Sequence, residues 1–149
     1  MVVAIGGNLL YDTEIRRVST TTGSTSATGA VPDNTDAVIA LGNGDVVAAG
    51  RFANSMSVAG GPTLTSNGGI DGFVVRLTQG LAHIWTANVG GTGSDDLRAL
   101  AALPTGEIVA VGSSASTFSF GAGQITNAGG ADALVLKLTS GGLAGDGLA

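Results

Sequence analysis

The stretch "NGGIDGFVVRL" (Asn67–Leu77) returns further along the chain as "NAGGADALVLKL" (Asn127–Leu138). Each copy contains a glycine pair, an aspartate, an apolar run and one basic residue. The two aspartates, Asp71 and Asp132, are 61 positions apart (132 − 71). Similarity at a fixed spacing of this size indicates a duplicated supersecondary unit. The duplication is either a binding site used twice or a building block that the fold needs twice.

The similarity extends toward the N-terminal side of each copy. "GNGDVVAAG" (Gly42–Gly50) matches "PTGEIVAVG" (Pro104–Gly112), with the final glycines 62 positions apart (112 − 50). Just before these stretches, "DAVIAL" (Asp36–Leu41) aligns with "RALAAL" (Arg98–Leu103) at the same spacing. The repeated unit is therefore long enough to contain several secondary-structure elements.

A third, shorter copy opens the chain. "VVAIGG" (Val2–Gly7) resembles "VVAAGR" (Val46–Arg51), and "DTEIRRVS" (Asp12–Ser19) resembles "DGFVVRLT" (Asp71–Thr78). The sequence is therefore about two and a half copies of one unit, beginning in the middle of a unit.

Each full unit predicts four short strands separated by glycine-rich turns. In the later unit they are His83–Val89, Arg98–Leu103, Glu107–Gly112 and Ala133–Leu138. These runs are apolar at successive positions instead of alternating, which is typical of sheets that are covered on both faces. The predicted fold is all-β: about two and a half four-stranded antiparallel β-propeller blades, as part of a larger or assembled propeller.

The predicted units divide the chain into four segments. Residues 1–30 hold a partial blade and a degenerate strand, 31–80 a near-complete blade, and 81–142 a complete blade. Residues 143–149 are the truncated start of a next blade or a tail. The innermost strand of the near-complete blade is expected within Ser19–Val31. A closed propeller has about 4 to 8 blades, so we expect further repeats or self-assembly to close the ring.

The composition excludes several classes of protein. Of 149 residues only 11% are charged and 44% are hydrophobic, which is not the composition of a disordered chain. The formal net charge of −5 argues against a nucleic-acid partner. The chain has no cysteine, so disulfides and thiolate metal sites are excluded. No apolar run approaches the roughly 18 residues of a membrane span, and no signal peptide is visible at the start.

The stretch "GGTGSDD" (Gly90–Asp96) ends in the candidate metal-binding residues Asp95 and Asp96. Adjacent carboxylates can hold calcium or bind a sugar hydroxyl. The alternative is that their oxygens cap the amides of the glycine-rich turn. The run lacks the alternating oxygen ligands of an EF-hand loop, which favours the capping role. No cofactor is expected other than calcium at these two residues.

The remaining polar residues of interest have a functional and a structural interpretation. The lone histidine, His83, is a candidate base or metal ligand, but beside Trp85 we expect it to pack or hydrogen-bond locally. Three aspartates in register, Asp12, Asp71 and Asp132, suggest either repeated metal sites or repeated turn caps, and we favour the caps. No catalytic residue is predicted. A basic residue five positions after each aspartate is expected to pair with a carboxylate of a neighbouring blade; these are Arg17, Arg76 and Lys137.

Most of the chain resembles a known family. "WTANVGGTGSDDLRALAALPTGEIVAVGSSASTFSF" (Trp85–Phe120), followed by "GGADALVLKLTSGG" (Gly129–Gly142), is similar to the bacterial β-propeller repeat called SBBP. The similarity rests on the tryptophan, the Gly-Gly-x-Gly-x-Asp stretch, the phenylalanine-bearing loop and the final Gly-Gly-x-Asp-Ala strand. It covers roughly residues 31–142, although the first unit lacks the tryptophan and the Gly-Gly-x-Gly-x-Asp stretch. The resemblance implies a propeller fold and a location outside the cell or at its surface.

The predicted function is non-enzymatic: a β-propeller repeat segment that acts as a structural scaffold or as an interaction surface. The expected partners are proteins or glycans, contacted by loops at 53–69 and 113–128, which are rich in Ser, Thr, Asn and Gly. Two alternatives stay open. One is a calcium- or glycan-binding lectin-like module that uses Asp95 and Asp96. The other is a fragment of a propeller enzyme with its site at the central channel, which the scarcity of His, Glu and Lys disfavours.

Overall fold

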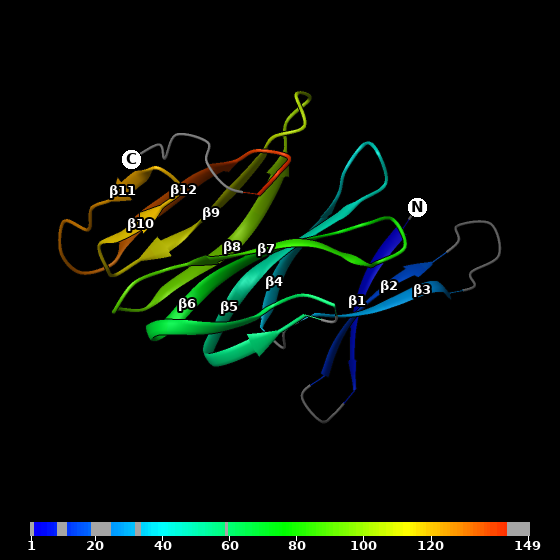
Figure 1. The fold of residues 1–149 in the computed structure, drawn as a ribbon, viewed down its shortest axis with the longest axis horizontal. Coiled ribbons are helices and arrows are strands. Elements are labelled where there is room, and N and C mark those ends of the chain that lie inside the picture. The colour runs from blue at the N-terminus through cyan, green and yellow to red at the C-terminus, as the bar shows by residue number, and fades with distance from the viewer. Residues whose placement is uncertain (1, 9–11, 19–24, 32–33, 59, 143–149) are drawn as a thin grey trace.

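The computed structural model describes residues 2–8, 12–18, 25–31, 34–58 and 60–142, with side chains from residue 34 onward. The regular structure in these residues is β-strand, and the paired strands are antiparallel. The strands form three sheets that follow one another along the chain, together with one small hairpin (Figure 1). The described part of the chain contains no helix that could cross a membrane. The prediction of an all-β antiparallel fold is thus confirmed.

In each sheet, strands that are consecutive along the chain pair as neighbours, apart from the hairpin that interrupts the third sheet. The first sheet consists of β1 (Val2–Asn8), β2 (Asp12–Val18) and β3 (Thr25–Val31). The second sheet consists of β4 (Thr35–Ala40), β5 (Val46–Ser57), β6 (Thr63–Leu77) and β7 (His83–Val89). The third sheet consists of β8 (Asp95–Ala102), β9 (Ile108–Ser114) and β12 (Asp132–Leu138). The small hairpin consists of β10 (Phe118–Phe120) and β11 (Gly123–Ile125).

The strand β7 lies in the second sheet and not, as we predicted, in the same sheet as β8, β9 and β12. It pairs with β6, where Gly72 lies opposite Val89. The reason is the tight turn after β6, in which the Leu81 N–H donates to the Thr78 carbonyl and the chain returns alongside β6. In the same way β3, which lies within the segment Ser19–Val31, pairs with β2.

The second and third sheets pair their strands in the same register. Ala48 of β5 lies opposite Val75 of β6, and Ala110 of β9 lies opposite Leu136 of β12. The offsets between these positions are 62 (110 − 48) and 61 (136 − 75). The spacing seen in the sequence is therefore also the spacing between residues that occupy the same place in the two sheets.

A close backbone approach recurs at a glycine in each of these sheets. The pairing of β4 with β5 shifts near the start of β4, opposite Gly50. The pairing of β8 with β9 shifts near the start of β8, opposite Gly112. A Cβ at Gly50 would lie 1.9 Å from the backbone oxygen of Asn34, and a Cβ at Gly112 would lie 1.9 Å from that of Asp96. Only glycine leaves room for this contact, which explains why both copies of the unit have it at this position.

The second sheet is buried on both faces, as the non-alternating strands predicted. One face packs on the third sheet, where β8 runs against β4, β5 and β6. The buried residues between these two sheets, called the first core, include Val47, Ala49, Val74, Val89, Leu97, Ile108, Ala110, Leu134, Leu136 and Leu138. The buried residues on the opposite face of the second sheet, called the second core, include Val46, Ala48, Phe73, Val75 and Leu77.

The segment 53–69 forms a hairpin and not the irregular loop that we predicted. Strands β5 and β6 continue past an irregularity between Ala53 and Ser55, where Asn54 has a φ of 60°. The hairpin beyond this point, residues 54–58 and 60–65, is called the first arm. Its serines and threonines are exposed, whereas apolar side chains alternate with them, as expected for a strand with one buried face. These apolar residues join the second core and are Met56, Val58 and Leu64.

The segment 113–128 likewise contains a hairpin, formed by β10 and β11. This second arm, residues 115–126, contributes Phe118, Phe120 and Ile125 to the first core. Phe118 lies opposite Ile125, as Met56 lies opposite Leu64 in the first arm. Both segments that we expected to be recognition loops therefore cover a core, because their apolar residues alternate with polar ones along short strands.

The offset changes from 62 to 61 at the tips of the arms. Ser57 lies opposite Thr63 in the first arm, and Ser119 lies opposite Gln124 in the second. The offsets are 62 (119 − 57) before the tip and 61 (124 − 63) after it, so the second arm is one residue shorter at its tip. The pairing on both sides of the tip keeps its register.

The third sheet exposes the face that points away from the second sheet. Val111 is 37% exposed and Val135 is 39% exposed. The corresponding residues of the second sheet, Ala49 and Val74, are 0% exposed because the third sheet covers them. The third sheet thus carries apolar side chains at positions that are buried one sheet earlier.

Candidate functional site

Asp95, one of the two candidate metal ligands, is a buried carboxylate at the start of β8. Its Oδ2 accepts hydrogen bonds from the Gly91 N–H at 2.9 Å and the Ser116 hydroxyl at 2.7 Å. Its Oδ1 accepts from the Ser114 hydroxyl and from the Ala115 N–H at 3.2 Å. A carboxylate offers about four lone-pair sites, and these four donors occupy them. The geometry is that of a cap for the turn before β8 and for the start of the second arm.

Asp96, the second candidate, is held by a cation and by β9. Its Oδ2 accepts from Arg98 Nη2 at 2.6 Å and Nε at 3.0 Å. Its Oδ1 accepts from the backbone N–H and the hydroxyl of Ser113, at 3.0 and 2.9 Å. The hydrogen bonds from Arg98 hold the pKa of Asp96 below its usual value, against the opposing effect of burial. A cation at this carboxylate would have to compete with Arg98.

The structure does not bring Asp95 and Asp96 together with other metal ligands. The described residues contain no group of three or more His, Asp or Glu side chains that could hold a metal ion. Their calcium-binding role stays a prediction, whereas the capping role of Asp95 is visible in its hydrogen bonds to Gly91 and Ala115.

Asp132 caps the turn that precedes β12, and Asp71 caps the corresponding irregular stretch within β6, between the paired residues Thr65 and Ile70. Asp71 Oδ2 accepts from the Asn67 N–H at 2.9 Å, and Asp132 Oδ2 accepts from the Ala128 N–H at 2.6 Å. In both cases the donor lies four residues before the aspartate, as in the Gly91–Asp95 pair. The interpretation of these aspartates as repeated caps is confirmed. Asp12, the third member, lies outside the residues whose side chains are described.

The second oxygen of Asp71 lies in surroundings that the sequence does not predict. Asp71 is 0% exposed, and among the described residues neither its Oδ1 nor the buried Oδ1 of Asn88 has a hydrogen-bond partner. A Cβ at Gly90 would lie 2.9 Å from both Asp71 Oδ1 and Asp95 Oδ2, so only a glycine fits between the two carboxyl groups. Burial raises the pKa of Asp71 against the opposing effect of the hydrogen bond from the Asn67 N–H, and the charge of Asp95 adds slightly to the rise.

The basic residues pair within their own sheet and not with a neighbouring one, which corrects our prediction. Arg76 donates to Asp45 Oδ2 from Nη2 at 2.7 Å and from Nε at 3.1 Å, and Lys137 Nζ lies 3.0 Å from Glu107 Oε1. Asp45 lies in the turn before β5, next to the end of β6 that carries Arg76. Glu107 lies in the turn before β9, next to the end of β12 that carries Lys137. Arg17 is outside the described side chains.

The ion pair in the second sheet also lowers the pKa of its acid. Burial raises the pKa of Asp45, but the hydrogen bonds from Arg76 and Asn43 outweigh this effect and keep the pKa below its usual value. Arg76 Nη1 additionally donates to the Ser140 carbonyl at 2.7 Å, which joins the second sheet to the segment after β12.

His83 and Trp85 of β7 have structural contacts. His83 Nε2 lies 2.8 Å from the Thr86 hydroxyl, and its ring lies so close to Gly61 that a Cβ there would be 2.6 Å from Cδ2. Trp85 donates its indole N–H to the Ser140 carbonyl at 3.1 Å. The local hydrogen bond of the histidine agrees with the expectation from the sequence.

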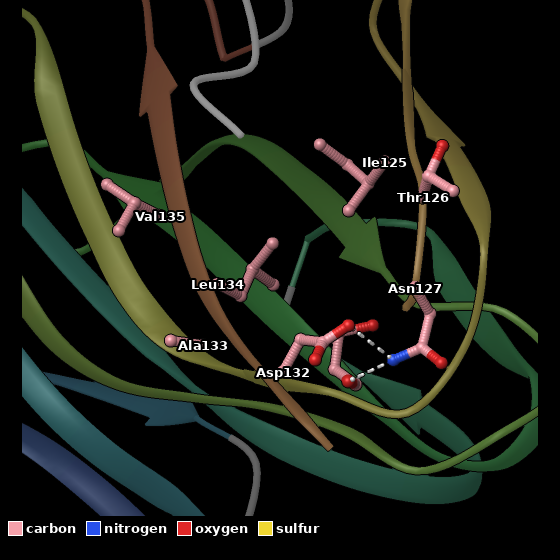
Figure 2. Close-up of a pocket in the computed structure, with 8 residues that line it drawn as sticks. Ile125, Thr126, Asn127, Asp132, Ala133, Leu134 and Val135 are labelled. Carbon is pink, nitrogen blue, oxygen red and sulfur yellow. Dashed lines mark hydrogen bonds between the residues drawn. The ribbon is translucent and has the colours of Figure 1, made fainter. Parts of the chain in front are cut away.

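A cavity of about 210 Å³ lies between β12 and the segment that follows β11. Figure 2 shows Ile125, Thr126 and Asn127 on one side of it and Leu134 on the other. The Asn127 amide donates to the Ser114 carbonyl and to Asp132 Oδ2, both at 3.0 Å, which fixes one end of the cavity. The cavity is therefore mainly apolar along β12 and polar at the start of that strand.

No family model matches the chain, and no curated protein matches it.

Proposed function

We propose that the chain is a non-catalytic β-propeller module, built from repeated blades, that serves as a structural scaffold and as an interaction surface for protein partners. The observation that carries the proposal is the common register of the second and third sheets, which pack face to face across the first core. A β-propeller consists of repeated antiparallel sheets packed around a common axis.

The use of the polar residues supports a non-catalytic role. Asp95 and Asp96 are engaged by backbone, hydroxyl and guanidinium donors, and His83 by a neighbouring threonine. Arg76 is engaged by Asp45 and by a backbone carbonyl. These contacts stabilise turns and strand ends, so the groups that could have supplied general acids, bases or metal ligands have structural partners instead.

The exposed face of the third sheet is the interaction surface that we propose. Val111 and Val135 occupy the positions that Ala49 and Val74 occupy in the second sheet, where the next sheet covers them. We propose that a further sheet of the same design covers this face. The resemblance to SBBP repeats supports this proposal and leads us to place the protein outside the cell or at its surface.

Sedimentation velocity over a range of protein concentrations tests the proposal. If the exposed face binds another sheet, the isolated chain will associate through it at high concentration, and Val111→Asp will weaken that association. An aspartate at such an interface would lose its hydration without gaining a partner, so we expect the association constant to fall by about tenfold or more, which corresponds to about 1.4 kcal/mol.

Ile84→Asp is the matched control. Ile84 of β7 is 41% exposed, similar to Val111, but it lies outside the proposed surface. This variant should associate as the wild type does. A wild-type chain that stays monomeric at all concentrations, or equal effects of the two substitutions, would contradict the proposed surface.

A further inference from the structure

The outer edge of β12 differs from the edge of its counterpart in the second sheet. β6 pairs with β5 on one side and with β7 on the other, whereas β12 pairs with β9 and has no second neighbour among the described residues. The two strands correspond because Phe73 lies opposite Gly50 and Leu134 opposite Gly112. An edge strand presents unpaired N–H and C=O groups to which another strand can bind.

The cavity beside β12 lies where β7 lies in the second sheet. Thr126 and Leu134, which line the cavity, correspond to Thr65 and Phe73 by the offset of 61 (126 − 65; 134 − 73). In the second sheet Asn88 of β7 lies opposite Phe73 and donates its amide to the Thr65 carbonyl at 3.1 Å. If a strand like β7 lay along β12, the side chain equivalent to that of Asn88 would therefore occupy the cavity.

We infer that the free edge of β12 and the adjoining cavity form an acceptor site for an extended peptide with the residue pattern of β7. The peptide adds antiparallel to β12, and its asparagine enters the cavity and donates to the Thr126 carbonyl. If the peptide pairs with β12 as β7 pairs with β6, the peptide residue equivalent to Val89 lies opposite Ala133, and the residue equivalent to Ala87 lies opposite Val135. Backbone hydrogen bonds supply the affinity, and the cavity selects the side chain.

The recognised chemistry follows from what β7 contributes to the second sheet. Ala87 and Val89 lie on the face of the second sheet that the third sheet covers, so their equivalents in the peptide would extend the apolar face that carries Val111 and Val135. Asn88 points to the other face and meets the arm through its hydrogen bond to Thr65. The inference concerns the edge of the third sheet, whereas the surface proposed above is its exposed face, and both rest on the same correspondence between the second and third sheets.

The test uses a labelled synthetic peptide with the sequence of residues 82–90, "AHIWTANVG", titrated into the full chain and followed by fluorescence anisotropy. We expect saturable binding with one peptide per chain. A peptide in which the asparagine equivalent to Asn88 is replaced by leucine loses the hydrogen bond to the Thr126 carbonyl and should bind about tenfold more weakly. A scrambled peptide of the same composition should not bind. Equal affinity for all three peptides would overturn the inference.

A protein variant and a localisation experiment complete the test. Ile125→Trp fills the cavity and should abolish binding, whereas Ser119→Trp, an exposed position on the same arm, should leave it unchanged. Thermal melting of both variants establishes that they are folded, and the peptide variants test the site independently of that result. Amide hydrogen exchange should show new protection in β12. Protection confined to β6, or a dimer that excludes the peptide, would overturn the inference.

The two proposals fail separately. If peptide binding is absent but Val111→Asp still weakens association, the exposed face stands and the strand-acceptor site falls. If the peptide binds β12 in a chain that does not self-associate, the acceptor site stands and the exposed face falls.

Discussion

The carboxyl group of Asp71 is buried beside the side-chain oxygen of Asn88, and that oxygen accepts no hydrogen bond from the described residues. Its Oδ1 and the Oδ1 of the adjacent Asn88 both lack a partner among the described residues, and the Asn88 amide is used by Thr65. A proton on Asp71 would convert one of the two acceptors into a donor. Because burial raises the pKa of this group, the folded protein binds that proton more tightly than the unfolded chain does.

Asp71→Asn tests whether the carboxyl group titrates with a raised pKa. The folded pKa lies above the ordinary value of 3.8, so the folded state binds the proton more tightly than the unfolded state. The resulting stabilisation is fully present below pH 3.8 and is lost as pH rises through the folded pKa. The asparagine does not titrate, so its free energy of unfolding relative to wild type should increase with pH.

Urea denaturation of both proteins at several values between about pH 4 and 8 measures this difference. Asp132→Asn places an amide in the corresponding turn and controls for the loss of the capping carboxylate. A difference between Asp71→Asn and wild type that stays constant with pH would show that Asp71 does not titrate with a raised pKa.

The sequence predicted part of this residue-level chemistry. The turn caps at Asp71 and Asp132 were predictable because each aspartate follows a glycine pair in a repeated stretch. The environment of the second oxygen of Asp71 could not be predicted, because it depends on Asn88. The repeat shows which residues correspond, but it does not show which sheet receives β7.

The two arms are regular hairpins and not the loops expected from their composition, and their role in recognition stays a prediction. Serine, threonine, asparagine and glycine dominate both segments, which led to the prediction of recognition loops. Met56 and Val58 alternate with exposed serines, and Phe118 and Phe120 flank an exposed Ser119 in the same way. This period of two is the signal of a strand with one buried face, and it was present in the sequence.

Phe118→Ala measures how much the second arm contributes to stability. Phe118 is 7% exposed and belongs to the first core. Its truncation should lower the free energy of unfolding by about 3 kcal/mol, the lower end of the cost of removing a buried aromatic ring. Urea denaturation measures the change. Ser119→Ala, on the exposed face of the same strand, should change stability by less than about 0.5 kcal/mol. Equal effects would show that the arm behaves as a loop.

At the level of the whole molecule, the first core joins two sheets into one unit. Residues of the second sheet, of the third sheet and of the second arm belong to the same buried cluster. The Ser140 carbonyl adds a polar link, because it accepts hydrogen bonds from Arg76 and Trp85 of the second sheet. The two sheets are therefore expected to unfold together.

Leu136→Ala tests this coupling. Leu136 is 0% exposed in the third sheet, whereas the single tryptophan of the chain, Trp85, is in the second. The substitution should cost about 2–5 kcal/mol and should shift the transition seen by tryptophan fluorescence and that seen by circular dichroism by the same amount. A shift that circular dichroism detects and tryptophan fluorescence does not would show that the sheets unfold independently.

Stacking of the sheets was predictable, whereas their boundaries were not. Strands without alternation indicated sheets covered on both faces, and the second sheet has this arrangement. A strand with glycine-rich turns on both sides can pair with the strand before it or with the strand after it. His83–Val89 is such a strand, and its pairing is decided by the tight turn at Thr78–Ala82.

The tips of the arms differ in length by one residue while the strands on both sides keep their register. The tips are thus the natural place for length variation among descendants of a duplicated unit. The same property is useful to the experimenter. Gly121 and Ala122, at the tip of the second arm, are exposed. An epitope tag or a reporter peptide inserted between them would extend into solvent and leave the framework that presents it unchanged.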